Sequence, residues 1–414
     1  MLDELKSFNK SVDILFIGSG SSIEKKILEG VGLKYVQIPA GKFRRYNRSI
    51  IQAALDVKTN WKNTKDFFSF NAGILKAHKI LRQFGPDVVF VKGGFVGLPV
   101  GIAARRLKLP LVIHESDLSF GMTNQFLAKF AVKVAVGFPL EFYRHTPYKN
   151  LIYTGSPVPR TSLAGDKKSA CHHFRITEEK PNIFITGGSQ GAQGINKVIF
   201  DNLELLSKHY NLIHQTGEGD IERARFLASR LPAGGKKSYR PYSFLKSEMG
   251  LAYALADVVI SRAGANALTN LAVWSKPAIV IPLPSSAQNH QVENARLLAR
   301  SGAIRVLPQA NLTGLRLASE IDGILNNKEA QAYLAQSIRK FYNPQAARDL
   351  AAVIYEEATR SHNLKGEKTW EIAKFVNRFG LLRRRFIEPD TLRQKNQCKS
   401  ATLCDPLFTY LLQA

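Results

Sequence analysis

The sequence has few cysteines and no long hydrophobic run. Its 414 residues include three cysteines, Cys171, Cys398 and Cys404, which are too few and too widely spaced for a disulfide framework or a zinc site. No stretch reaches the roughly 18 uncharged apolar residues of a membrane-spanning helix. The opening MLDELKSFNK lacks the basic-then-apolar pattern of a signal peptide. We therefore expect a protein of the reducing cytoplasm, with no metal site and no cofactor.

Acidic side chains are scarce relative to basic ones. Lys and Arg total 58 against 33 Asp and Glu, a net charge of +25, and residues 1–155 alone carry 23 basic and 11 acidic side chains, a net +12. Such an excess favours a polyanionic neighbour: nucleic acid, anionic lipid or a phosphorylated substrate. Because the sequence shows no helix-turn-helix, zinc finger or aromatic single-strand platform, we predict an anionic membrane surface and no nucleic acid. A merely solvated excess of lysine is the alternative.

Short apolar, β-rich runs alternate with amphipathic stretches over most of the chain. Most runs are continuously apolar, which is typical of parallel strands covered on both faces. Helical patterns lie between them, as at 74–84, 100–107 and 265–273. This alternation predicts doubly wound α/β domains. The predicted strands are 12–17, 88–92, 111–114, 132–137, 182–186, 212–215, 258–261 and 278–282.

Turn residues cluster at 154–159 (TGSPVP), and a second strand–helix series begins at Asn182. We predict two Rossmann-like domains facing a cleft, 1–155 and 160–340, with 341–360 forming a helix that returns to the first domain. The basic tail, 361–414, has a net charge of +5. Within it, 370–386 carries apolar residues on one helical face and basic residues off it. That pattern fits a helix lying on anionic lipid, and equally a helix docked on the protein.

Two glycine-containing turns each join a predicted strand to a predicted helix: ITGGSQGA at 185–192 and SRAGANALT at 261–269. Glycines let a phosphate approach the backbone, and a helix N-terminus offers N–H groups and a positive dipole end. Taken alone, each turn is also explained by chain geometry. Together, facing one cleft, they suit a nucleoside diphosphate.

Polar side chains also follow strands in the first half. KGGFVGLPV (92–100) and IHESD (113–117) come at strand ends, so His114, Glu115 and Asp117 stand where open α/β sheets bind ligands. A lone buried histidine is more often a packed residue, but three adjacent ionisable residues favour a site. Farther on, His290, Gln291 and Asn294 share a helical face, where amides suit sugar hydroxyls or simply face solvent.

In combination, these motifs resemble the lipid II-forming N-acetylglucosaminyltransferase (MurG) family. The run KGGFVGLPVGIAARRLKLPLVIHESDLSFGMTNQFLAKFA is similar to its acceptor-domain signature, and ITGGSQGAQGIN, HQTGEGD, SRAGANALTNLA and PLPSSAQNHQVENA are similar to its donor-domain motifs, in order. The resemblance covers roughly residues 10–358. It implies a GT-B fold and inverting transfer of N-acetylglucosamine from UDP-N-acetylglucosamine to undecaprenyl-diphospho-N-acetylmuramoyl-pentapeptide, forming lipid II by a β1→4 bond.

The resemblance also implies roles for individual residues. Catalytic roles fall to His114 and Glu115, with Asp117 and Asn124 lining the acceptor side. The implied donor-binding residues are Arg160; Gly188, Ser189, Gln190 and Gly191 at the diphosphate; Leu245 near the uracil; Gly264, Ala265, Asn266, Ala267, Leu268 and Thr269 around uridine and phosphates; Asn270 at the ribose; and His290 and Gln291 at the sugar hydroxyls.

Three departures from the family pattern stand out. The family opens with a strand and a GGTGGH-type loop whose histidine is a possible general base, whereas this sequence begins in the helix that follows. A start site placed too late explains this best; a catalytically impaired remnant that binds nucleotide sugar or membrane is the alternative. Asn270 replaces a ribose-binding glutamate. Pro159 stands where the family has a donor-binding arginine, with Arg160 one position later.

Attachment to the cytoplasmic face of the plasma membrane is expected to come mainly from the first domain. Segment 67–84 combines Ile74, Leu75, Leu81 and Phe84 with Lys76, Lys79 and Arg82, and 41–48 adds four more cations. Related GT-B enzymes with another substrate, a UDP-N-acetylglucosamine 2-epimerase or a glycolipid synthase, remain alternatives to the MurG activity.

Overall fold

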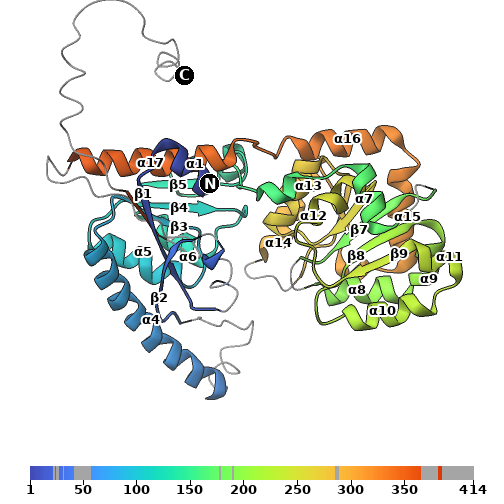
Figure 1. Cartoon of the computed structure of the whole chain (residues 1–414), viewed down its shortest axis with the longest axis horizontal. Helices are drawn as coiled ribbons and strands as arrows, with labels where there is room; N and C mark the ends of the chain where they lie inside the picture. The colour runs from blue at the N-terminus through green and yellow to red at the C-terminus, as the bar shows by residue number, and fades with distance from the viewer. Residues whose placement is uncertain are drawn as a thin grey trace, which may run out of the picture.

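The chain forms two α/β lobes that lie side by side (Figure 1). The structure is a computed structural model, and it describes residues 1–21, 24, 28–30, 32–41, 57–176, 179–188, 191–284, 289–364 and 381–384. Ser189, Gln190, the basic segment at 42–48 and most of the tail therefore lie outside the described residues. The fold class predicted from sequence, two α/β domains built on parallel sheets, is confirmed.

The first lobe is built on a four-stranded parallel sheet of order β3-β4-β5-β6. Its central residues are buried because helices cover the sheet, which explains why these strands read as continuous apolar runs. The strands are β3 (Val89–Val91), β4 (Leu111–Glu115), β5 (Lys133–Val136) and β6 (Leu151–Tyr153). Helix α5 (Gly97–Arg106) crosses from β3 to β4, and α6 (Met122–Leu127) from β4 to β5.

A three-stranded sheet completes this lobe. Strand β1 (Val12–Gly18) pairs in parallel with β2 (Lys34–Gln37) on one side. On the other side it pairs antiparallel with β13 (Leu381–Arg384), which also contacts β3. The helix predicted over 370–386 is therefore wrong for 381–384, because pairing with the backbone of β1 overrides the local helical pattern. The rest of that segment lies outside the described residues.

Three other described helices belong to the first lobe. Helix α17 (Ala346–Leu364) returns from the second lobe and packs against α1 (Leu2–Phe8) (Figure 1). Its Leu350 and Ile354 join a core with Leu5 of α1 and Phe90 of β3. Helix α4 (Val57–Phe84) packs on α5.

Side chains of α4 do not all face the way the sequence suggested. Ile74 and Leu81 were expected on an exposed membrane-facing surface, but both are buried. Packing of α4 on α5 turns them inward. Among the described side chains of this helix, the exposed large apolar ones are Phe67, Phe68 and Leu75.

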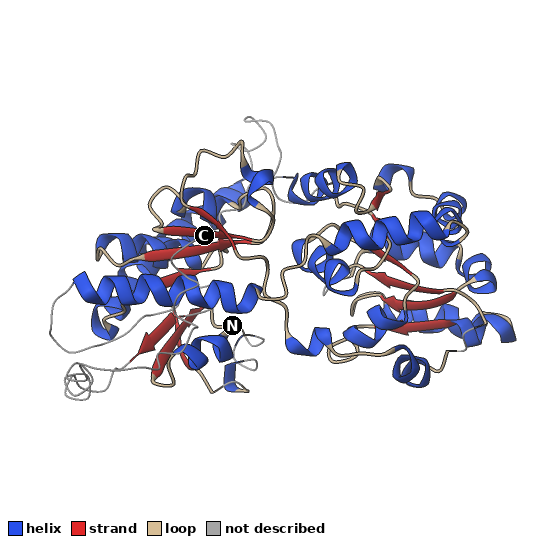
Figure 2. Cartoon of the chain, turned by 90° about the horizontal axis from the view of Figure 1, so that it is seen from above, coloured by secondary structure: helices blue, strands red, loops and turns tan. Residues whose placement is uncertain are grey.

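The second lobe contains a six-stranded sheet of order β12-β11-β10-β7-β8-β9, in which every neighbouring pair is parallel. Helices lie on both of its faces (Figure 2). The strands are β7 (Asn182–Thr186), β8 (Asn211–Gln215), β9 (Tyr239–Tyr242), β10 (Val258–Ser261), β11 (Ala278–Val280) and β12 (Arg305–Val306). The helices are α7 (Lys167–Phe174), α8 (Gln193–Asp201), α9 (Leu203–His209), α10 (Ile221–Arg230), α11 (Ala233–Ser238), α12 (Met249–Leu255), α13 (Ala265–Trp274), α14 (His290–Arg300), α15 (Gly314–Leu325) and α16 (Lys328–Arg339).

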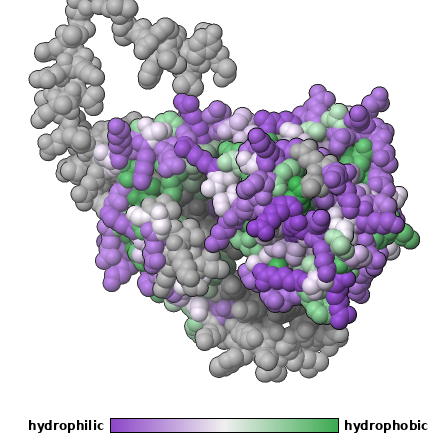
Figure 3. Space-filling view, turned by 45° about the vertical axis from the view of Figure 1, so that its right-hand side comes forward, coloured by the Kyte–Doolittle hydropathy of each residue, from purple (hydrophilic) through white to green (hydrophobic). Residues whose placement is uncertain are grey.

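No helix among the described residues combines the length and the apolar character needed to cross a membrane. Where Figure 3 is coloured, hydrophilic residues cover most of the surface and hydrophobic residues lie between them.

Candidate active site

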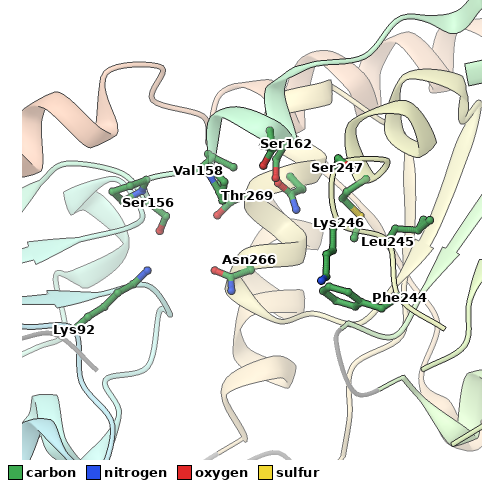
Figure 4. Close-up of a pocket in the computed structure, with 15 residues that line it drawn as sticks. Lys92, Ser156, Val158, Ser162, Phe244, Leu245, Lys246, Ser247, Asn266 and Thr269 are labelled. Carbon is green, nitrogen blue, oxygen red and sulfur yellow. The ribbon is translucent and has the colours of Figure 1, made fainter. Parts of the chain in front are cut away.

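Two adjoining cavities open between the lobes, with volumes of about 660 and 630 Å³. We call the first the base cavity and the second the phosphate cavity, after the groups that we propose they hold. They share Lys92 of the first lobe and Phe244, Met249, Asn266 and Asn270 of the second. Figure 4 shows Lys92 and Ser156 reaching in from one side, opposite Asn266 and Thr269 on α13.

Glycine-containing turns at two strand ends form the second-lobe wall of the phosphate cavity. Gly187 and Gly188 follow β7, and Gly264 to Ala267 follow β10. Helix α8 begins at Gln193, beyond the first turn, and α13 begins at Ala265, within the second; no side chain of the described residues caps either N-terminus. Their first N–H groups are therefore available to an anion. Both turns predicted from sequence line one cavity, as expected for a diphosphate site.

A buried arginine faces the same cavity. The Arg262 guanidinium donates to the carbonyl oxygens of Ile281 (3.0 Å) and Pro282 (3.4 Å), and burial lowers its pKa from the ordinary value. Carbonyl oxygens carry no net charge, so the cation remains available to a bound phosphate. The sequence indicates Arg262 only by its place in the SRAGA turn at 261–265.

The base cavity takes its walls from the segment after β9 and from α13. Phe244 and Leu245 line it with Asn266, Thr269 and Asn270. The Asn270 side-chain oxygen is buried without a hydrogen-bond partner among the described residues, although it sits at the junction of the two cavities. An unsatisfied buried acceptor at a cavity wall suits a ligand hydroxyl.

Glu115 supplies the main ionisable group on the first-lobe side. Its carboxylate lines the phosphate cavity and accepts hydrogen bonds from the backbone N–H groups of Asp117 (3.1 Å) and Gly121 (2.9 Å). The Asn124 amide donates a third, at 2.9 Å. Burial raises the pKa of Glu115 to about 7, although these donors act in the opposite direction. A carboxylate with that pKa can accept a proton near neutral pH.

His114 has a different environment. It is fully buried, and its Nε2 is 2.9 Å from the Gly155 carbonyl oxygen. Burial, with the nearby Lys92 cation, lowers its pKa to about 3, so the ring is neutral. Nε2 therefore carries the proton and donates it to Gly155. His114 holds the strand end in place one residue before Glu115.

Asn294 joins the lobes, which the sequence analysis missed. Its amide donates to the Asp117 carboxylate at 2.8 Å and to the Ala263 carbonyl at 3.0 Å, while its oxygen accepts from the Leu118 N–H at 3.0 Å. The sequence pattern groups Asn294 with His290 and Gln291 on one helical face suited to sugar hydroxyls. The structure instead uses it to connect α14 to the loop after β4.

Other predicted residues occupy varied places. Gln291 lines the phosphate cavity and accepts from the Leu283 N–H. His290 and Leu268 do not appear among the described lining residues. Arg160 is exposed and extends toward Glu4, 3.7 Å away, so it does not line either cavity. Gly191 adjoins Thr216, and a Cβ there would collide with the Thr216 carbonyl.

Across the described residues, no three His, Cys, Asp or Glu side chains group closely enough to hold a metal ion.

Two family domains match the chain, one on each lobe. The glycosyltransferase family 28 N-terminal domain matches residues 1–136, and the family 28 C-terminal domain matches residues 182–353. The two cavities lie between the matched regions.

Named relatives and solved structures agree with this match. The chain is 34% identical over 336 residues to a UDP-N-acetylglucosamine–N-acetylmuramyl-(pentapeptide) pyrophosphoryl-undecaprenol N-acetylglucosamine transferase 2 of Bacillus cereus, covering 81% of this chain and 88% of that protein. It is 34% identical to the transferase of Lachnoclostridium phytofermentans, covering 77% and 84%.

Among solved structures, Acinetobacter baumannii MurG superposes with a TM-score of 0.60 at 25% identity, covering 82% of this chain and 90% of that one. A Neisseria meningitidis UDP-GlcNAc 2-epimerase, at 13% identity and a TM-score of 0.57, covers 86% and 94% and shares the fold alone. The chain belongs to glycosyltransferase family 28 and, within it, to the MurG family of N-acetylglucosaminyltransferases.

Proposed function

We propose that this chain transfers N-acetylglucosamine from UDP-N-acetylglucosamine to an undecaprenyl-diphospho-N-acetylmuramoyl-pentapeptide, forming lipid II for peptidoglycan. The observation that carries the proposal is the arrangement across the phosphate cavity. The turn after β7, the N-terminus of α13 and Arg262 line one wall, and the Glu115 carboxylate lines the other. The named relatives are transferases with this donor and this acceptor.

The donor binds along the second lobe in this proposal. The uridine lies in the base cavity beside Leu245 and Phe244, with its ribose hydroxyls at the unsatisfied oxygen of Asn270. The diphosphate lies against the turns after β7 and β10. As the bond to the sugar breaks, negative charge grows on the departing UDP. The helix ends and Arg262 stabilise that charge where it develops.

The acceptor enters from the first lobe. Its sugar hydroxyl attacks the anomeric carbon from the face opposite UDP, the new C–O bond forms as the C–O bond to UDP breaks, and the configuration inverts. The hydroxyl proton passes to Glu115, whose pKa of about 7 suits a general base. Asn124, Gly121 and Asp117 hold the carboxylate in place. His114 positions this strand end.

Peripheral attachment to an anionic membrane surface completes the proposal. On α4, the exposed Phe67, Phe68 and Leu75 lie among the exposed Lys76, Lys79 and Arg82. Apolar side chains inserted between headgroups, with cations worth about 1 kcal/mol each near an anionic surface, give reversible docking. The first lobe then faces the lipid-linked acceptor.

A transfer assay tests the activity. Purified chain is incubated with UDP-N-acetylglucosamine and a lipid-linked muramoyl-pentapeptide in detergent micelles, and the lipid extract is analysed by mass spectrometry. We expect a lipid product enlarged by one N-acetylhexosamine, with one UDP released per product. Conversion of the donor's sugar to another epimer without any change in the lipid would instead indicate an epimerase. UDP binding without turnover would indicate the binding remnant.

A further inference from the structure

Gln215 is the last residue of strand β8, and it lines the inner wall of the phosphate cavity. Only 1% of its surface is exposed. The strand carries it to the carboxyl edge of the sheet, between the turn after β7 and the segment after β9. A primary amide has one acceptor oxygen and two donor hydrogens, so it can bond to two different backbone segments at once.

Both ends of this amide are used. The Gln215 Nε2 donates to the Gly188 carbonyl at 2.9 Å and lies 3.4 Å from the Thr186 hydroxyl. Its Oε1 accepts from the Leu245 N–H at 3.1 Å. One side chain therefore fixes the separation between Gly188 and Leu245.

The two segments that it joins line different cavities. Gly188, with a φ of +84°, belongs to the turn of the phosphate cavity, and Leu245 lines the base cavity. Thr186 supports the same turn, since its hydroxyl accepts from the Gly188 N–H at 3.2 Å. A nucleotide that occupies both cavities needs both segments at the correct distance, whereas a nucleoside needs only one.

We propose that Gln215 is a positioning residue that holds the phosphate-binding turn and the base-binding segment in register, so that the two halves of the donor nucleotide bind cooperatively. This inference rests on the proposed function. Gln215 acts through Gly188 and Leu245, by removing the need to order two separate segments when UDP binds.

Two variants distinguish the contribution of the hydrogen bond made by the Gln215 Nε2 from that of the bond made by its Oε1. Gln215→Met keeps the length of the side chain but loses both bonds. Gln215→Glu keeps an acceptor for the Leu245 N–H and loses the donor to the Gly188 carbonyl. Asn211→Leu is the matched control, since it removes a buried amide from the other end of β8, where it bonds to Lys180 and Asn182.

Calorimetric titration with uridine, UMP and UDP measures the effect. We expect Gln215→Met to weaken UDP binding roughly tenfold and uridine binding roughly two- to threefold, as one or two neutral hydrogen bonds are lost. Gln215→Glu should bind uridine like the wild type, and it should weaken UDP at least as strongly, because the new carboxylate both loses the donor to Gly188 and repels the diphosphate. This recovery of uridine binding is not expected from general loss of structure. Asn211→Leu should leave the ratio of UDP to uridine affinity unchanged.

The outcomes separate this inference from the proposed function. If the wild-type chain does not bind UDP, the proposed function fails. If it binds UDP but the ratio of UDP to uridine affinity is the same in Gln215→Met, the inference alone is wrong. Should Gln215→Met not fold, Thr186→Val removes the hydroxyl that supports Gly188 and, with Gln215→Glu, gives the same test. An unchanged ratio in both variants overturns the inference.

Discussion

The Asn294 amide of α14 donates a hydrogen bond to the Asp117 carboxylate of the first lobe at 2.8 Å. This bond joins the wall that carries Glu115 to the wall that carries the glycine-containing turns. Replacing Asn294 with Leu leaves the part-buried Leu118 N–H and the buried Ala263 carbonyl without this partner. Each buried unsatisfied group costs about 1–3 kcal/mol.

For Asn294→Leu we therefore expect a lower free energy of unfolding in urea. We also expect a fall in kcat/KM of about a hundredfold, because small misplacement of reacting groups has effects of that order. Asn326→Leu, at an exposed position after α15, is the control and should change neither quantity. Wild-type kcat/KM in Asn294→Leu would show that the bond does not set the distance between the walls.

A second prediction concerns the ribose. If the unsatisfied oxygen of Asn270 faces the ribose hydroxyls, Asn270→Glu provides a charged acceptor there. Charge-assisted hydrogen bonds exceed neutral ones by about 1 kcal/mol, so UDP affinity should rise about fivefold in calorimetry. The analogue 2′-deoxy-UDP should gain less. Equal gains for both nucleotides, or weaker binding of UDP, would place the ribose elsewhere.

A third prediction concerns the membrane. Replacing Phe68 and Leu75 of α4 with Ser should reduce co-sedimentation with anionic vesicles, and raising salt should reduce it further, since the Debye length falls to about 3 Å at 1 M. The control replaces two equally exposed apolar residues of the second lobe, Phe226 and Leu315, with Ser. If the control loses as much binding as the α4 variant, the docking surface is not α4.

The pairing of β13 with β1 gives a fourth prediction. A chain ending at residue 364 lacks β13, whereas one ending at residue 384 keeps it. Hydrogen exchange should be faster at the β1 amides that face β13 in the shorter chain, because a strand edge without a partner loses its ladder bonds. The longer chain should exchange like the full protein. Equal exchange in the two truncated chains would show that 381–384 does not protect β1.

The sequence predicted the buried strands well and the half-exposed strands poorly. Strands β7 and β10 have the predicted bounds because they are fully buried and have apolar centres. Strands β2 and β9 were not predicted, since their part-exposed residues give no clear apolar pattern. Strand β13 was predicted as helix because its partner is more than 360 residues away in the sequence.

The site, too, could be predicted only in part from the sequence. Both glycine-containing turns and the polar residues after β4 were located from their places at strand ends. Successive residues of a strand point to opposite faces, however, and a sequence does not say which face borders the cavity. His114 and Glu115 therefore looked equivalent, but His114 turns to Gly155 and Glu115 lines the cavity. The roles of Asn294 and Gln215 depend on contacts between distant segments.

The central claim is that the first lobe supplies the general base, Glu115, while the second lobe binds the donor nucleotide. The variant Glu115→Gln tests this claim most directly. Glu115 must be ionised to accept a proton, and its pKa is raised to about 7. Wild-type kcat/KM should therefore rise with pH through about 7 and level off above it. Glu115→Gln should lose this rise and about 100- to 10,000-fold of activity, the usual contribution of a general base.

The deciding measurement compares transfer by Glu115→Gln with its affinity for UDP. We predict that the transfer rate falls by at least about a hundredfold while the calorimetric Kd for UDP stays within about a factor of two, because the donor binds on the other lobe. Transfer at the wild-type rate would contradict the role of Glu115. A parallel loss of UDP affinity would contradict the separation of acceptor and donor sites between the two lobes.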